Sequence, residues 1–179
     1  VISTLHNLSS RSLDEIEREL RDYSKSAPIE LILPSLYSEL GGSALKNIVE
    51  CLSKIKYLNH ITIGLDRATK KEYIKAKDFF SNLNQSHSVL WNDSPKMKKL
   101  DKDFMALGIA PDQAGKGKNV WYCMGYTYSR NEAKSVALHD CDIMTYSREL
   151  LAKLVYPVAN PHFNYEFCKG YYPRVRDGS

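Results

Sequence analysis

Two carboxylates one residue apart, Asp140 and Asp142, are the sharpest chemical feature of this sequence. They follow the apolar run 136–139, so both side chains could serve one site where the chain leaves a sheet. Paired carboxylate oxygens suit Mg²⁺ or Mn²⁺, which usually take their remaining ligands from water and a diphosphate. An isolated pair of this kind is more often a solvated strand end or a helix cap. Its interpretation therefore depends on the other segments of the chain.

Two further segments offer groups suited to a nucleotide. Gly115-Lys116-Gly117 precedes a predicted helix, where glycines let backbone N–H groups approach a phosphate and the lysine adds a charge. It matches neither a Walker loop nor G-x-G-x-x-G, and alone it would indicate a flexible turn. The segment 34–39, Pro-Ser-Leu-Tyr-Ser-Glu, follows an apolar run. Glu39 could accept hydrogen bonds from ribose hydroxyls, hold this loop, or cap the next helix.

The elements that must position these segments begin with four apolar runs. Strands are predicted at 29–33, 60–65, 88–91 and 136–139, the first of them ended by Pro34. Helices are predicted from Ser12 and Thr69, each with a glutamate three residues on, and from about Ser43 and Lys118.

This alternation predicts an α/β fold with a Rossmann-like, mostly parallel sheet flanked by helices. Such sheets bind ligands at the carboxyl ends of their strands. The segment 34–39, Asp66 and the acidic pair all fall at such ends. His139 should point to the opposite face from its acidic neighbour, which favours a structural role.

Composition limits the class of protein. With 179 residues, 43% of them hydrophobic, the chain can bury one substantial core. A net charge of +4 falls short of a nucleic-acid binder, so no nucleic-acid partner is expected. No apolar run approaches the roughly 20 residues that span a bilayer. The four cysteines form no C-x-x-C pair, which fits reduced thiols in a cytoplasm.

Taken in order, these segments resemble the glucosyl-3-phosphoglycerate synthases, retaining glycosyltransferases of the type-A fold. That family has P-x-L-x-E-E after the first strand, then an acidic strand end, then G-K-G before a helix with a tryptophan, and finally an apolar strand ending in D-x-D. The residues that fit are Pro34, Leu36, Glu39, Asp66, Lys116, Trp121, Asp140 and Asp142. Residues 167–174 are similar to the family's K-S-F-Y-R stretch, so the resemblance spans about 29–174.

The sequence departs from this pattern in two places. Tyr37 and Ser38 replace an asparagine and the first of the paired glutamates, and Arg67-Ala68 replaces a Gly/Ser-rich turn. These departures bear on the identity of the nucleotide and sugar more than on the reaction class.

The resemblance implies a role for each matching residue. Asp142 would bind Mg²⁺ or Mn²⁺, and Asp140 would share the metal or contact the ribose. Lys116, Asp66 and the segment 34–39, including Pro34, Leu36 and Glu39, would hold the nucleoside. Lys169 and Arg174 could face a phosphorylated or carboxylated acceptor, or belong to a solvated edge strand, with equal weight.

The implied activity is transfer of a hexose from UDP-glucose or GDP-mannose to a small acceptor such as 3-phosphoglycerate. In that family a metal-binding histidine and the acceptor loop lie further along, so we expect this chain to lack the acceptor part. Residues 1–27 would form a helical lead-in and 28–179 the nucleotide-sugar-binding domain. The oligomeric state stays open, with a homo-oligomer among the options.

Three alternatives stay open. An inverting transferase shares the fold but needs a catalytic base. A sugar-phosphate nucleotidyltransferase has a related sheet, but the segment 34–39 lacks the glycines and basic residues of its signature. A non-catalytic domain that binds a nucleotide or a partner protein is the third, and fold alone does not decide among them.

Overall fold

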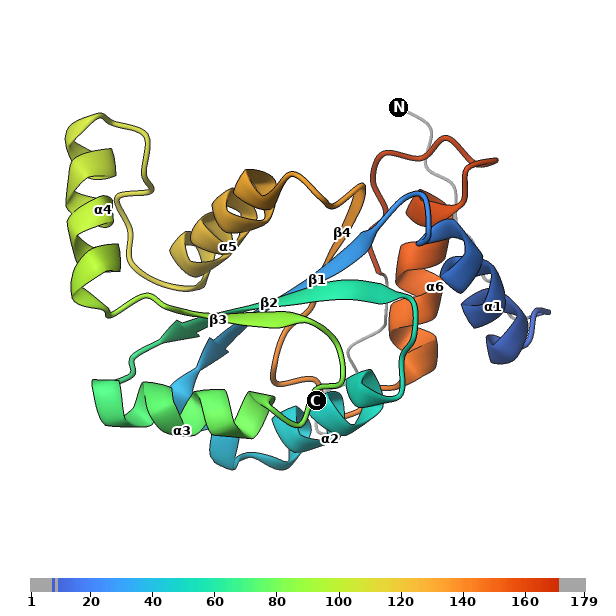
Figure 1. Ribbon diagram of the computed structural model, residues 1–179, viewed down its shortest axis with the longest axis horizontal. Helices are drawn as coiled ribbons and strands as arrows, with labels where there is room; N and C mark the ends of the chain where they lie inside the picture. The colour runs from blue at the N-terminus through green and yellow to red at the C-terminus, as the bar shows by residue number, and fades with distance from the viewer. Residues whose placement is uncertain (1–7, 9, 171–179) are drawn as a thin grey trace, which may run out of the picture.

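The centre of the fold is a four-stranded parallel sheet (Figure 1). The computed structural model describes residues 8 and 10–170. The strands are β1 (Ile29–Leu36), β2 (Leu58–Asp66), β3 (His87–Trp91) and β4 (Ser135–Leu138), in the order β3-β2-β1-β4. The chain moves outward from β1 to β3 and then returns to the other side of β1. This reversal creates a topological switch point between β1 and β4, where open α/β sheets bind ligands.

Helices cover both faces of the sheet, as predicted. They are α1 (Leu13–Tyr23), the 3₁₀ helix η1 (Tyr37–Gly41), α2 (Ser43–Ser53), α3 (Lys70–Phe80), α4 (Pro95–Ala106), α5 (Lys116–Arg130) and α6 (Arg148–Ala159). In Figure 1, α5 lies on one side of the sheet and α2 and α3 on the other. The capping boxes predicted at Ser12 and Thr69 are both present. None of the helices within the described ranges is long and apolar enough to cross a bilayer.

Two predicted boundaries are wrong. Pro34 does not end β1, which continues to Leu36 and pairs Pro34 with Gly64 of β2. The proline is tolerated because β4 pairs with β1 only as far as Ile32, so beyond that point no strand needs the missing N–H. The helix predicted from Lys118 begins at Lys116, directly after Gly115, whose φ of 134° is open to glycine but rarely to other residues.

The two faces of the sheet differ in chemistry. Alternate residues of β1 and β2 enter the main apolar core with α1, α2, α3 and α6; they include Leu31, Leu33, Ile61, Ile63 and Leu65. The residues between them, Glu30, His60, Thr62 and Gly64, face α5, as the α5 contacts of Glu30, Thr62 and Gly64 indicate. The α5 face is therefore a buried polar interface.

Polar bonds along its length hold α5 on this face. Near its C-terminal end, Arg130 lies 3.5 Å from the buried carboxylate of Glu30. Near its start, the amide of Asn119 donates to the Gly64 carbonyl at 2.9 Å. A Cβ at residue 64 would lie 1.8 Å from the Asn119 Oδ1. Glycine at this position therefore lets the first turn of α5 rest on β2, and this contact fixes where Lys116 lies.

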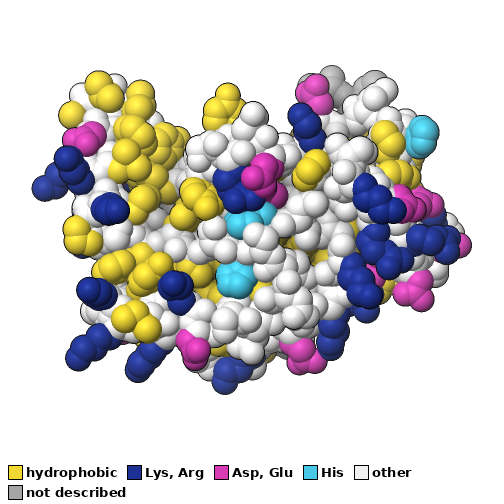
Figure 2. Space-filling model, viewed as in Figure 1, with side chains coloured by type: hydrophobic (Ala, Val, Ile, Leu, Met, Phe, Trp, Pro, Cys, Tyr) yellow, Lys and Arg dark blue, Asp and Glu magenta, His cyan; other side chains and the backbone are white. Residues whose placement is uncertain are grey.

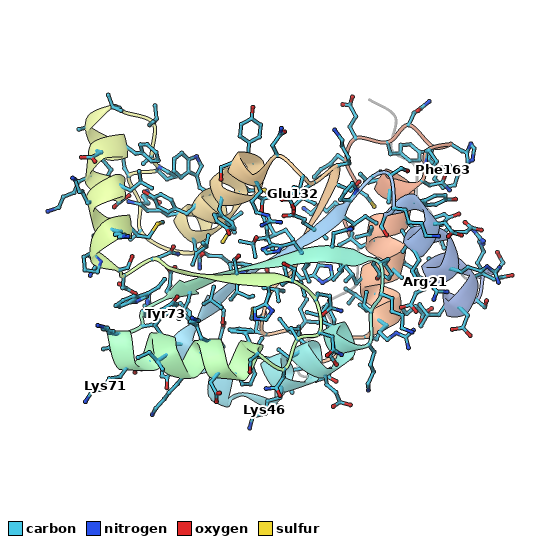
Figure 3. The ribbon with its side chains drawn as sticks, in the orientation of Figure 1. Arg21, Lys46, Lys71, Tyr73, Glu132 and Phe163 are labelled. Atoms are coloured by element: carbon cyan, nitrogen blue, oxygen red, sulfur yellow. The ribbon has the colours of Figure 1, made fainter. Side chains whose placement is uncertain are left out.

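The outer elements are attached differently. The Tyr73 ring of α3, labelled in Figure 3, belongs to one such attachment. It stacks on Trp91 of β3 with 5.2 Å between the ring centroids. By contrast, α4 has no buried residue. Hydrophobic side chains gather over α4 and the neighbouring surface in Figure 2, and the exposed ones include Leu100, Met105, Leu107 and Ile109. Within residues 96–102, Met97 and Asp101 are half-buried and the other side chains are exposed.

Candidate nucleotide and metal site

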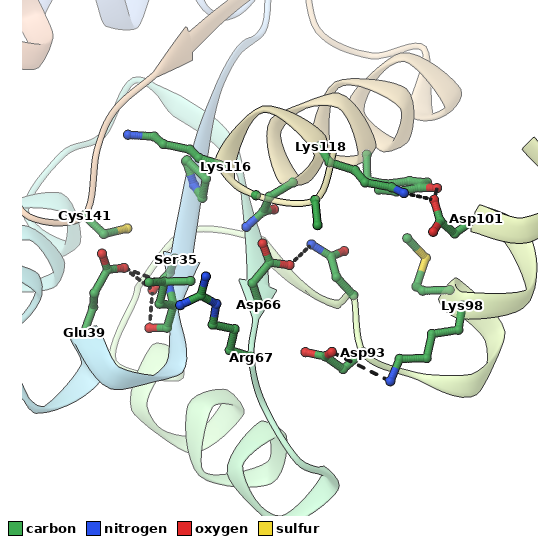
Figure 4. Close-up of a pocket in the computed structure, with 18 of the residues that line it drawn as sticks. Ser35, Glu39, Asp66, Arg67, Asp93, Lys98, Asp101, Lys116, Lys118 and Cys141 are labelled. Carbon is green, nitrogen blue, oxygen red and sulfur yellow. Dashed lines mark hydrogen bonds and ion pairs between the residues drawn. The ribbon is translucent and has the colours of Figure 1, made fainter. Parts of the chain in front are cut away.

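A pocket of about 500 Å³ lies at the carboxyl ends of the strands (Figure 4). It brings together most of the side chains predicted to bind a nucleotide or metal: Pro34, Leu36, Glu39, Asp66, Lys116 and Asp142. These residues come from the ends of β1 and β2, the start of α5 and the segment after β4. Parallel strands gather separate polar segments at one edge in this way.

Glu39 of η1 holds the end of β1. Its Oε2 accepts hydrogen bonds from the backbone N–H of Leu36 at 2.8 Å and from the Ser35 hydroxyl at 3.2 Å. These bonds cap η1, so the structure supports the predicted options of loop holding and capping. The end of β1 therefore presents Pro34, Ser35 and Leu36 to the pocket in a fixed conformation.

The acidic pair takes two different positions. Asp140 forms an ion pair with Lys116 and does not line the pocket, whereas Asp142 is exposed and does. Cys141 between them is buried, and burial raises the pKa of its thiol to about 12. The lysine of the glycine-rich segment and the first acid are thus brought together, and their charges are already paired.

Asp140 and Asp142 are the residues that the resemblance assigns to a divalent metal. Within residues 8 and 10–170, no group of three or more His, Cys, Asp or Glu side chains could hold a metal ion. Two carboxylates with hard oxygens fit Mg²⁺ or Mn²⁺ only if water, a diphosphate or further protein groups complete the shell. Asp140 and Asp142 therefore fit as part of such a site.

His139 does not add to this donor set. Its ring is buried, its Nδ1 lies 3.0 Å from the Tyr146 hydroxyl, and burial lowers its pKa to about 4. The structural role expected for this histidine agrees with these contacts.

The ends of β2 and β3 add polar groups that the sequence analysis missed. Asn92 donates to the Asp66 Oδ1 at 2.7 Å, and the Asp93 Oδ2 accepts from the backbone N–H of Ala68 at 3.0 Å. Burial raises the pKa of the Asp66 carboxyl, against the hydrogen bond from Asn92. The signal was available, since Asn92-Asp93 directly follows the predicted strand 88–91.

The wall formed by α4 was also missed. Asp101 accepts a hydrogen bond from the Tyr122 hydroxyl at 2.6 Å and pairs with Lys118 at 2.6 Å. Burial alone would raise the pKa of the Asp101 carboxyl, but these two partners outweigh it and lower the pKa. Lys98 and Asp101 line the pocket, so this side of α4 faces the site. Through its bond to Asp101, Tyr122 ties α5 to α4.

The residues predicted on the acceptor side are not part of this pocket. Lys169 is exposed, in a segment without regular secondary structure, and does not line the pocket. Arg174 lies outside the described residues.

Comparisons with known proteins identify the relatives of this chain. No protein-family model matches it. Over 175 residues, 98% of this chain, it is 46% identical to the glucosyl-3-phosphoglycerate synthase of Persephonella marina. The chain is a homologue of part of the glucosyl-3-phosphoglycerate synthases. The synthase of Methanococcoides burtonii is 35% identical over 175 residues, and the chain spans 43% of the length of each of these synthases.

A solved structure supports the fold assignment. The glucosyl-3-phosphoglycerate synthase of Mycobacterium tuberculosis, in complex with Mn²⁺, UDP and glucosyl-3-phosphoglycerate, superposes with a TM-score of 0.53 at 16% identity. The match covers 88% of this chain and 47% of that synthase. The predicted type-A glycosyltransferase fold is confirmed, for about half of a whole synthase.

Proposed function

We propose that this chain is the nucleotide-sugar-binding part of a glucosyl-3-phosphoglycerate synthase. The reaction would transfer glucose, or a related hexose, from a nucleoside diphosphate sugar such as UDP-glucose or GDP-mannose to 3-phosphoglycerate. The observation that carries this proposal is the pocket at the switch point, which joins Lys116, Asp142 and the loop after β1. The 46% identity to the Persephonella marina synthase supports this proposal.

Each group in the pocket has a distinct part in binding. The segment 34–39, held by Glu39, would support the nucleoside through its backbone groups. Lys116, at the start of α5, would bind the diphosphate, because its charge and the N-terminal end of a helix both attract anions. Asp66 would accept hydrogen bonds from the nucleoside.

Asp140 and Asp142 would hold Mg²⁺ or Mn²⁺ beside the diphosphate. The cation would supply positive charge that stabilises the departing nucleoside diphosphate. This role requires no nucleophile from the described residues. The Asp140 carboxylate must leave Lys116 to contribute, and a diphosphate that attracts Lys116 favours that exchange.

Residues 28–179 would be the nucleotide-sugar-binding domain, with 1–27 as its lead-in and Lys169 and Arg174 toward the acceptor. Cys51, Cys123, Cys141 and Cys168 are free thiols, which supports a reducing compartment such as the cytoplasm.

The test is a thermal-shift panel with nucleotides and sugar conjugates. A ligand that binds only the folded chain raises its melting temperature. We expect UDP, GDP or their hexose conjugates to stabilise the chain more with Mn²⁺ than without it. Stabilisation by a nucleoside triphosphate and a sugar phosphate, but by no diphosphate, would instead indicate a nucleotidyltransferase. No shift with any nucleotide would contradict the proposal.

A further inference from the structure

The turn that ends β2 places two consecutive side chains in the pocket. In an extended strand, Asp66 and Arg67 would point to opposite faces. Arg67 instead has a φ of 55°, in the left-handed region that residues with a Cβ seldom adopt. Both side chains line the pocket, and Arg67 extends beside Asp66 toward Ser35 (Figure 4).

The end of β3 holds this turn in place. The backbone N–H of Asn92 donates to the Leu65 carbonyl at 3.1 Å, and its side chain donates to Asp66. Asp93 accepts from the N–H of Ala68, whose carbonyl accepts from the Trp91 indole at 2.7 Å. Bonds on both sides of Arg67 therefore fix its unusual backbone, as is common for strained residues at functional sites.

The guanidinium of Arg67 is available to a ligand. The side chain is exposed, and among the described residues it forms no hydrogen bond or ion pair. It lies at the end of β2, two strands from the acidic pair after β4. Strands about 4.8 Å apart separate these ends by about 10 Å, a span that ribose and phosphate can bridge. A nucleotide whose diphosphate meets Lys116 and Asp142 would therefore bring its base toward Asp66 and Arg67.

We infer that Asp66 and Arg67 together select a nucleoside diphosphate whose base carries a ring N–H beside a carbonyl, namely uracil or guanine. This inference rests on the proposed function and adds the pair of residues that would recognise the base of the donor. The Asp66 carboxylate accepts the N–H, and the Arg67 guanidinium donates to the carbonyl. One Asp66 oxygen already accepts from Asn92, but an ionised carboxylate has lone pairs for further donors.

Cytosine and adenine present the reverse pattern. Their ring nitrogen is an acceptor and would face the Asp66 carboxylate, while their amino group would face the Arg67 guanidinium. Both pairings are repulsive, and specificity often depends on such mismatches as much as on favourable contacts.

The experiment measures the affinities of UDP, CDP, GDP and ADP for the chain at one Mn²⁺ concentration. UDP and CDP differ only at the base edge, so their ratio isolates base selection from diphosphate binding. We expect the wild-type chain to bind UDP or GDP at least about tenfold more tightly than its amino counterpart, the scale of one good base-edge contact. A preference for UDP over CDP would indicate uracil, and a preference for GDP over ADP would indicate guanine.

Arg67→Gly is the decisive variant. Glycine accepts the positive φ, so the fold should be retained or slightly stabilised. We expect the preference for the keto base to fall to about twofold or less, because the donor is lost. Asp66→Asn should weaken UDP and strengthen CDP, since the amide can donate to the ring nitrogen of cytosine.

Lys98→Met is the matched control. Lys98 is another exposed cation of the same pocket, on α4. It lies 3.8 Å from the Asp93 Oδ1, whereas the Ala68 N–H donates to the other oxygen, Oδ2, so the loss of Lys98 removes a charge and keeps the bond that holds the Arg67 turn. We expect this variant to keep the UDP to CDP ratio.

The outcomes separate this inference from the proposed function. If no nucleoside diphosphate binds the wild-type chain, both are overturned. If UDP or GDP binds with metal enhancement but Arg67→Gly leaves the ratio unchanged, the proposed function stands and this inference is overturned. If Arg67→Gly lowers the affinities for UDP and CDP by the same factor, Arg67 contacts the phosphates and not the base, and this inference is also overturned.

Discussion

Lys116 at the start of α5 and Asp140 after β4 form an ion pair with each other. Each of them is also proposed to bind part of the substrate complex: Lys116 the diphosphate, and Asp140 the metal ion. Without a nucleotide, therefore, Lys116 neutralises a carboxylate that a divalent cation would use. Binding of the diphosphate and binding of the metal should each make the other more favourable.

Lys116→Met tests this relationship. Removing the lysine frees Asp140, so Mn²⁺ affinity of the nucleotide-free chain should rise by up to about fivefold, the scale of an exposed ion pair. Metal-free affinity for UDP should fall. Electron paramagnetic resonance of free Mn²⁺ and calorimetry measure the two effects. Lys118→Met, whose partner is Asp101, is the control. Weaker Mn²⁺ binding in Lys116→Met would contradict the idea that Lys116 and the metal ion compete for Asp140.

Gly64→Ala tests the contact that positions α5. The new Cβ would lie 1.8 Å from the Asn119 Oδ1 and 2.5 Å from the Cys123 Sγ, so α5 must shift. We expect the free energy of unfolding to fall by about 2 kcal/mol or more, as for other overpacked cores, and metal-free UDP affinity to fall with it. Urea denaturation measures the first effect.

Gly125→Ala is the control for the same helix. Gly125 lies in α5, and a Cβ added there would meet no atom within 4 Å, so alanine should stabilise the chain by about 0.5 to 1 kcal/mol. A Gly64→Ala chain as stable as this one would show that α5 does not depend on close approach to β2.

His60 predicts a dependence of stability on pH. Its ring lies between the hydroxyls of Ser86 and Ser88, and burial, aided by the charge of Arg130, lowers its pKa to about 4. The unfolded chain binds this proton near its usual value of about 6.5. The free energy of unfolding therefore falls as the pH drops from about 6.5 to about 4, by at most about 3 kcal/mol. Below about pH 4 His60 contributes no further change.

His60→Gln should flatten this part of the pH profile, although the variant loses some stability at every pH. Urea denaturation at several pH values measures the slope. The same substitution at the exposed His162 is the control and should leave the slope unchanged. An equal slope in wild type and His60→Gln would contradict the assignment.

Much of the fold could be predicted because strand ends leave local signals. Asp66, Asp142 and the segment 34–39 each follow an apolar run, and parallel pairing brings such ends to one edge. The sequence could not predict the extent of β1 past Pro34, because that depends on where β4 stops pairing.

The contacts of α5 also could not be predicted. The approach of Asn119 to Gly64 and the pairing of Lys116 with Asp140 depend on how the helix lies on the sheet, which no local pattern records. A glycine in an apolar strand run signals close approach of some element, but it does not say which one.

Calorimetric titration of UDP and GDP into the chain, with and without Mn²⁺, in wild type and Asp142→Ala tests whether Asp142 supports metal-dependent nucleotide binding. Asp112→Ala, an exposed acid that does not line the pocket, is the control. We predict that Mn²⁺ tightens binding of at least one diphosphate in wild type and in the control, and that Asp142→Ala loses this enhancement. The same enhancement in Asp142→Ala would contradict a metal site at Asp142 and the metal-dependent nucleotide binding proposed for this chain.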